Sequence, residues 1–126
     1  MIYLCNGLSE SMKHDPNMIQ IPYALSEREF CELIHCAEFT SVIGHKVLAQ
    51  YLTELTGLEI PFNRKAIQVS YDDMILLVSM NGRLPEHPTF VDYKGRLNYT
   101  LVRFEKQSQA NFIESMMKIE EIKEAC

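Results

Sequence analysis

The sequence predicts a small α/β (α+β) domain with a mixed β-sheet of about five strands. Helices are expected to pack mainly on one face of this sheet, with one added helix at the C-terminus. The chain has the length of one domain, at 126 residues, and 47% of these are hydrophobic. Segments with strand spacing and segments with helix spacing follow one another along it. We therefore expect a single domain over residues 1–126, with residues 107–126 as a helical extension.

Two strands are predicted near the N-terminus. Residues 2–5 form an apolar run that ends at Asn6-Gly7, which is typical of a buried strand followed by a turn. Residues 19–24 alternate well enough for a second strand. Because proline lacks the backbone N–H that a sheet needs, Pro22 favours an edge position for this strand.

Two helices are expected in the next segment. Ser26 and Glu29 have the spacing of a capping box, and apolar residues follow at helical intervals as far as Ala37. A second helix is predicted to begin at or near His45. It should end at Gly57, because glycine readily adopts the left-handed conformation that closes a helix.

The second half of the chain predicts strands followed by a helix. Residues 66–71 and 74–80 are interpreted as two strands of a hairpin, joined by a tight acidic turn. Residues 99–104 are predicted as the last strand. Residues 108–124 carry an apolar stripe at helical spacing and are predicted as the closing helix.

Charge and hydropathy exclude several classes of function. The formal net charge of −5 disfavours a role in binding duplex DNA, which usually requires a basic surface. The middle segment, residues 61–104, is mildly basic, with six bases and four acids. A few of these bases could hold a compact anion, although charge alone favours an ordinary mixed surface. No apolar run approaches the roughly 20 residues that span a bilayer, and the start does not resemble a signal peptide. We expect no membrane partner and a cytoplasmic location.

The cysteines give no sign of a metal site. Cys5, Cys31, Cys36 and Cys126 form no Cys-x-x-Cys pair and are not spaced with the histidines as zinc ligands would be. We expect four free thiols in a reducing compartment, with no metal and no cofactor.

The segment Ser41-Val42-Ile43-Gly44-His45 is the first candidate for chemistry. A helix N-terminus presents unpaired N–H groups to a phosphate, and Gly44 allows close approach to the backbone. A histidine at this position can donate a proton to a leaving oxygen. Taken alone, however, a Gly-His pair is more typical of a surface histidine after a turn.

Three further groups carry polar residues that fit an anionic ligand. They are Asn6-Gly7-Leu8-Ser9 after the first strand, Asn63-Arg64, and Arg83-Leu84-Pro85-Glu86 after the strand at 74–80. Arg83 can clamp a phosphate with two hydrogen bonds, and Glu86 can orient that arginine or contact a ribose hydroxyl. Taken alone, each group is more typical of an ordinary turn or a surface ion pair.

In this order and spacing, the four groups resemble the viral ring nuclease family of type III anti-CRISPR proteins. The resemblance extends from Met1 to about Glu86. It implies a mixed sheet with helices, a homodimer, and cleavage of cyclic tetra-adenylate, which switches off type III CRISPR second-messenger signalling. It also implies that the reaction needs no metal, since a ribose 2′-hydroxyl is the nucleophile.

The resemblance also implies roles for individual residues. His45 corresponds to the catalytic general acid, Arg83 would stabilise charge in the transition state, and Glu86 corresponds to an active-site carboxylate. The substrate-binding residues would be Asn6, Gly7, Ser9, Gly44, Arg64 and Ser79, although the family commonly has glutamine at the position of Ser79. The short helix that the family has after the Arg83–Glu86 loop looks nearly deleted here.

Two other functions remain open at this stage. The same pocket would serve a sponge that sequesters a cyclic nucleotide without cutting it. Alternatively, the C-terminal amphipathic segment would serve a protein-interaction factor that binds no nucleotide.

Overall fold

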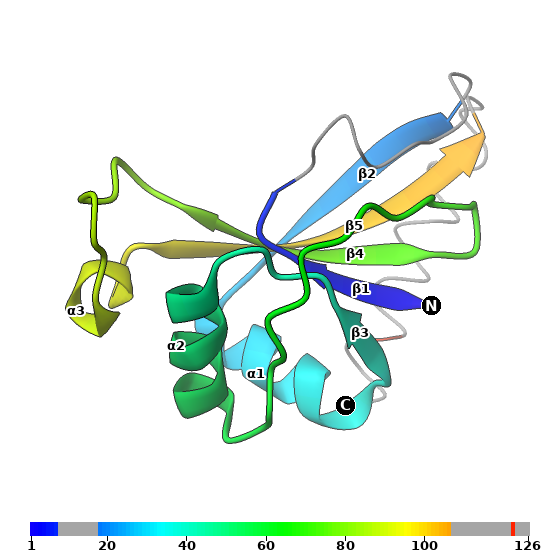
Figure 1. Ribbon diagram of the computed structural model, residues 1–126. Helices are drawn as coiled ribbons and strands as arrows, with labels where there is room; N and C mark the ends of the chain where they lie inside the picture. Colours follow the sequence, from blue (N-terminus) through cyan, green and yellow to red (C-terminus); the bar gives the residue numbers. More distant parts are fainter. Residues whose placement is uncertain (8–17, 107–121, 123–126) are drawn as a thin grey trace.

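The computed structural model describes residues 1–7, 18–106 and 122 (Figure 1). This part of the chain contains five strands and three helices, which confirms the predicted α+β fold with a mixed sheet. Along the chain they are β1 (Ile2–Cys5), β2 (Met18–Leu25), α1 (Glu27–Cys36), β3 (Phe39–Ser41), α2 (Lys46–Thr56), β4 (Met74–Met80), α3 (Phe90–Tyr93) and β5 (Leu97–Lys106).

The sheet has the strand order β2-β5-β4-β1-β3. β1 lies between β3 and β4 and runs parallel to both of them, with Tyr3 in register with Thr40 and Ile75. β5 is antiparallel to β4 on one side and to β2 on the other. β2 is therefore an edge strand, and the expectation drawn from Pro22 is confirmed.

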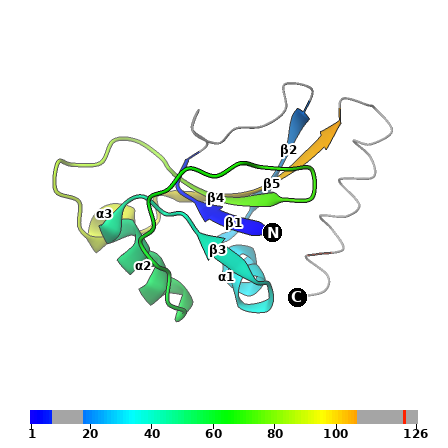
Figure 2. The ribbon, with the colours of Figure 1, turned by 45° about the vertical axis from the view of Figure 1, so that its right-hand side comes forward.

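The sheet is covered on both faces (Figure 2). The three helices lie on one face, and the segment between α2 and β4 crosses the other. The helix-side core contains Leu4, Phe30, Leu52, Leu76, Tyr93 and Leu101 among its buried residues. The opposite core, which we call the coil-side core, contains Cys5, Ile67, Val69, Ile75, Val102 and Phe104.

The helix ends follow the sequence signals. At α1 the Glu29 N–H donates to Ser26 Oγ at 3.1 Å, and the Ser26 N–H donates to Glu29 Oε1 at 2.9 Å, so the capping box is formed. α2 ends at Gly57, whose φ of 75° lies in the left-handed region. The two helices are joined where His35 Nε2–H donates to the Thr56 carbonyl at 2.6 Å.

The predicted hairpin over residues 66–80 is wrong in its first strand. Residues 66–71 form no strand, because β4 is already paired with β1 and β5 and has no free edge. The alternation that suggested a strand is real, since Ile67 and Val69 are buried in the coil-side core. The Asp73 carboxylate then accepts from the Ser70 N–H at 2.9 Å and turns the chain into β4.

Two short elements were not predicted, and one predicted element lies outside the described residues. β3 has only three residues. α3 is a single turn of four residues, so the helix after the Arg83–Glu86 loop is present but short. The expected C-terminal helix at residues 108–124 falls outside the described part of the chain except for Ile122, which packs partly buried against the helix-side core.

The expectation of four free thiols is wrong for one cysteine. Cys5 and Cys31 are free thiols, whereas Cys36 is disulfide-bonded.

If residues 66–71 stabilise the fold by packing alone, Ile67→Ala should lower the free energy of unfolding by about 2–3 kcal/mol. Ile67 is buried in the coil-side core, so truncating its side chain would leave a cavity there. Urea denaturation followed by circular dichroism measures the loss. Gln68→Ala is the matched control, since Gln68 is exposed, and it should change stability by less than about 0.5 kcal/mol. Equal losses in the two variants would contradict the packing.

Candidate functional site

The polar residues of interest lie where the three parallel strands end. β1, β3 and β4 end at Cys5, Ser41 and Met80, and their carboxyl ends meet at one edge of the sheet. Open α/β sheets bind ligands in the crevice outside such ends. The residues that follow these strands, including Asn6, Gly44 and His45, therefore define the candidate site.

Asn6 ties the end of β1 to the segment before α2. Its side-chain Oδ1 accepts from the Gly44 N–H at 2.8 Å, and the Val42 N–H donates to the Leu4 carbonyl at 2.8 Å. These two bonds continue the parallel pairing of β1 and β3 beyond the strand ends. They fix Gly44 beside Asn6, which places the N-terminus of α2 at the edge of the sheet.

The segment from Pro61 to Arg64 is attached to the other side of Gly44. The Asn63 N–H donates to the Ile43 carbonyl at 3.0 Å, and Asn63 Nδ2 donates to the Ser41 carbonyl at 3.0 Å. The stem of Arg64 consequently lies against Gly44, and a Cβ on Gly44 would come within 3.4 Å of Arg64 Cγ. Arg64 is an exposed residue, so its guanidinium group is accessible to an anion.

His45 is the N-cap residue of α2, and its side chain makes no capping hydrogen bond. The residue is exposed. Because a helix N-terminus carries unpaired N–H donors and partial positive charge, a phosphate placed here would meet both the donors and the imidazole. This is the arrangement expected from the segment Ser41 to His45.

A cavity of about 120 Å³ opens beside His45. It is smaller than the roughly 300–1,000 Å³ of pockets that enclose drug-sized ligands, so it has room for only part of a nucleotide. Its polar lining comes from Asn6, His45 and Ser79, and its apolar lining from Leu48, Val78, Met80, Leu84, Tyr93 and Leu97. The structure thus brings three of the expected site residues to one hollow, from β1, α2 and β4.

Arg83 and Glu86 lie in the exposed loop between β4 and α3. Neither is among the residues that line the cavity, although Leu84 between them is. Gly7 is exposed, with open space where a Cβ would lie. Ser9 lies outside the described residues. The expected site residues therefore divide into a group fixed at the strand ends and a pair carried on a loop.

Arg96 is a site-adjacent residue that the sequence analysis missed. Its side chain donates to the carbonyl of Arg83 at 3.0 Å and to that of Asn81 at 3.3 Å. Nothing in the local sequence distinguishes it from an ordinary surface arginine, because the carbonyls it binds are 13 and 15 residues away along the chain.

The cysteine next to Asn6 is not a nucleophile. Cys5 is 1% exposed, and burial raises the pKa of its thiol to about 12. Since the thiolate is the reactive form, this sulfur is inert at neutral pH. Among the described residues, no group of three or more His, Cys, Asp or Glu side chains is placed to hold a metal ion. Nor does the described part contain a helix that is long and apolar enough to cross a membrane.

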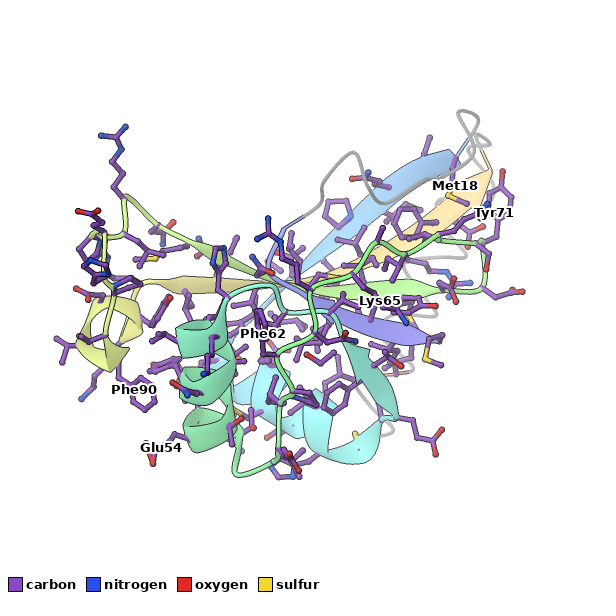
Figure 3. The ribbon with its side chains drawn as sticks, in the orientation of Figure 1. Met18, Glu54, Phe62, Lys65, Tyr71 and Phe90 are labelled. Atoms are coloured by element: carbon purple, nitrogen blue, oxygen red, sulfur yellow. The ribbon has the colours of Figure 1, made fainter. Side chains whose placement is uncertain are left out.

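A groove of about 590 Å³ runs along the outer face of α2 (Figure 3). Phe62 and Phe90 line it and are 52% and 36% exposed. Lys46 lies at the start of α2 and Glu54 nearer its end, and both also line the groove. The lining is mainly apolar and also includes Gln50, Thr53 and Glu59.

The fold and site define a small α+β domain with a polar site at the carboxyl ends of its parallel strands. Residues 2–93 match the STIV B116-like family, and the chain belongs to this family. It is 28% identical over 107 residues to "Uncharacterized protein 26" of Sulfolobus islandicus filamentous virus (isolate Iceland/Hveragerdi), a match that covers 83% of this chain and 91% of that protein. The family is thus one with viral members.

A solved structure has the same fold. B116 of Sulfolobus turreted icosahedral virus (STIV) superimposes with a TM-score of 0.65 at 23% sequence identity, covering 81% of this chain and 97% of that one. The expected link to a family of viral proteins is confirmed at this level.

If Asn6 acts first as a support for Gly44, Asn6→Ala should lower the free energy of unfolding by about 1 kcal/mol, because the Gly44 N–H loses its acceptor. Asn6→Asp keeps an oxygen at the same place and should retain most of that stability. Urea denaturation measures both variants, and amide hydrogen exchange at Gly44 should accelerate only in Asn6→Ala. Equal destabilisation by Ala and Asp would overturn the assignment.

Proposed function

We propose that this protein is a metal-independent ring nuclease that binds and cleaves cyclic tetra-adenylate and so switches off type III CRISPR signalling. The observation that carries the proposal is the meeting of Asn6, His45 and Ser79 around one cavity at the N-terminus of α2. The resemblance over Met1 to Glu86 supports the substrate, and membership of a family with viral members supports the role. The proposed place of action is the host cytoplasm, where this messenger is made.

In the proposed reaction the RNA supplies its own nucleophile. A ribose 2′-oxygen forms a bond to the adjacent phosphorus and loses its proton to solvent, while the bond from phosphorus to the 5′-oxygen breaks. His45 gives a proton to that departing oxygen. Each cleavage leaves a 2′,3′-cyclic phosphate and a free 5′-hydroxyl, so two cleavages of the ring give two linear di-adenylates. No redox step occurs, and no co-reactant is required.

The remaining residues are assigned to binding and charge stabilisation. The N–H groups at the start of α2 and the Arg64 guanidinium would hold phosphates of the ring. Gly44 allows close approach, and Asn6, Gly7, Ser9 and Ser79 would contact the nucleotides nearby. Arg83 would stabilise charge on the phosphorane-like transition state, with Glu86 orienting groups around it. Because the cavity holds only part of a nucleotide, most of the ring would lie on the surface outside it.

Wild-type protein should convert cyclic tetra-adenylate to di-adenylate in the presence of EDTA, and His45→Ala should lower the rate about 10²–10⁴-fold by removing the proton donor. Chromatography of the reaction products measures both. His87→Ala is the matched control, since His87 is an exposed histidine with no assigned role, and it should leave the rate unchanged. An intact ring after incubation with wild type, or an equal rate in His45→Ala, would refute the proposal.

Binding without cleavage is the second candidate. It is favoured by the position of Arg83 and Glu86, which lie outside the cavity lining. The same assay separates the two candidates, because a sponge would retain cyclic tetra-adenylate intact, equally in wild type and in His45→Ala.

We further propose that two copies form a homodimer through the groove along α2. In an antiparallel arrangement, Lys46 of one copy would meet Glu54 of the other, and Phe62 would be buried between them. Two active sites would then serve a four-fold ring.

Sedimentation velocity should give the mass of a dimer for wild type, and Phe62→Ser should shift the population towards monomer. Val91→Ser is the control, because Val91 is 80% exposed but does not line the groove. A monomeric wild type would exclude the dimer. A dimer that tolerates Phe62→Ser would exclude this surface.

A further inference from the structure

The guanidinium group of Arg96 lies inside the loop that joins β4 to α3. Its Nη2 donates to the carbonyls of Arg83 and Asn81 at 3.0 and 3.3 Å, and its Nη1 donates to the carbonyl of Asp92 at 3.4 Å. Among the described residues, no carboxylate forms an ion pair with it. This half-buried arginine therefore uses its fork of donors to hold backbone rather than to pair a charge.

Other bonds close the same loop at its base. The Asn81 N–H donates to the Arg96 carbonyl at 2.8 Å, and the Asn98 Nδ2 donates to Asn81 Oδ1 at 2.6 Å. Gly82 has a φ of 88°, and a Cβ there would lie 3.0 Å from Arg96 Nη2. A side chain at position 82 would therefore crowd the Arg96 guanidinium, and the left-handed φ by itself disfavours one there.

We propose that Arg96 is a positioning residue, which acts by fixing the backbone from which the Arg83 side chain departs. This inference rests on the proposed ring nuclease function. Arg83 is exposed and takes part in none of the ion pairs of the described residues, so its backbone decides where its guanidinium can reach. Holding that backbone before substrate arrives reduces the ordering that catalysis would otherwise require.

Lysine cannot replace the arginine in this role. A lysine ammonium is a single point with a different reach, whereas the planar guanidinium presents donors at both Nη atoms to three carbonyls. Arg96→Lys keeps the charge, so its effect reports on the contacts rather than on net charge.

The test is a double-mutant cycle on cleavage of cyclic tetra-adenylate. Arg96→Lys should lower kcat at least 10-fold with little change in KM. In an Arg83→Ala background, the same substitution should have almost no further effect, because Arg96 acts through Arg83. Arg28→Lys is the matched control, since Arg28 lies on the surface of α1 in an ion pair with Glu32, and it should leave kcat unchanged.

A second measurement does not depend on activity. Amide hydrogen exchange in residues 81–89 should accelerate in Arg96→Lys while exchange in α1 stays the same. If Arg96→Lys does not fold, Arg96→Gln removes the same guanidinium contacts and should give the same loss of kcat.

The outcomes separate this inference from the proposed function. An active wild type whose kcat is insensitive to Arg96→Lys would overturn the positioning role, as would a full additional loss in the Arg83→Ala background. An inactive wild type would refute the proposed function instead, and the exchange rates would then decide whether Arg96 holds the loop at all.

Discussion

The parallel pairing of β1 with both β3 and β4 is the constraint on which the rest of the structure depends. A four-residue strand between two parallel neighbours must be buried on both faces, so Leu4 packs under the helices while Cys5 packs under the coil. The same pairing aligns three carboxyl ends at one edge. The location of the candidate site is therefore a consequence of the sheet topology.

The segment between α2 and β4 covers the face of the sheet that has no helices. Ile67 and Val69 supply the buried surface that a strand or helix would otherwise provide. Earlier in the same segment, Asn63 donates hydrogen bonds to the carbonyls of Ile43 and Ser41. These bonds place the stem of Arg64 beside Gly44. The segment thus covers the coil-side core and also places Arg64 beside Gly44, so in the proposed function the packing of that face would also position a cation for the ligand.

Elements with local signals were predictable from the sequence, and elements fixed by distant contacts were not. The Ser26 capping box and the Gly57 stop depend on neighbouring residues and were located correctly. The segment 66–71 has the alternation of a strand, but whether it joins the sheet depends on free edges elsewhere, which a local pattern cannot reveal. The capping pair Thr89–Asp92 at α3 was a readable signal that was overlooked. For the site, the cluster of Asn6, Gly44 and His45 follows from strand ends, whereas the contact of Arg96 with Arg83 has no local trace.

The expected site residues have two kinds of support. Asn6 follows the end of β1, Ser79 lies near the end of β4, and the backbone before His45 is tied to β1 through the bond between Gly44 and Asn6. Arg83 and Glu86 lie on the loop between β4 and α3. At the start of this loop Arg96 donates to the Arg83 carbonyl, and at its end the Thr89 N–H donates to Asp92 Oδ2. The Asn6 side-chain oxygen accepts from the Gly44 N–H. The amide nitrogen of the same side chain remains a donor for a ligand. In the proposed function, the strand ends would bind an anion on the edge of the sheet, and the loop would supply the charge of Arg83.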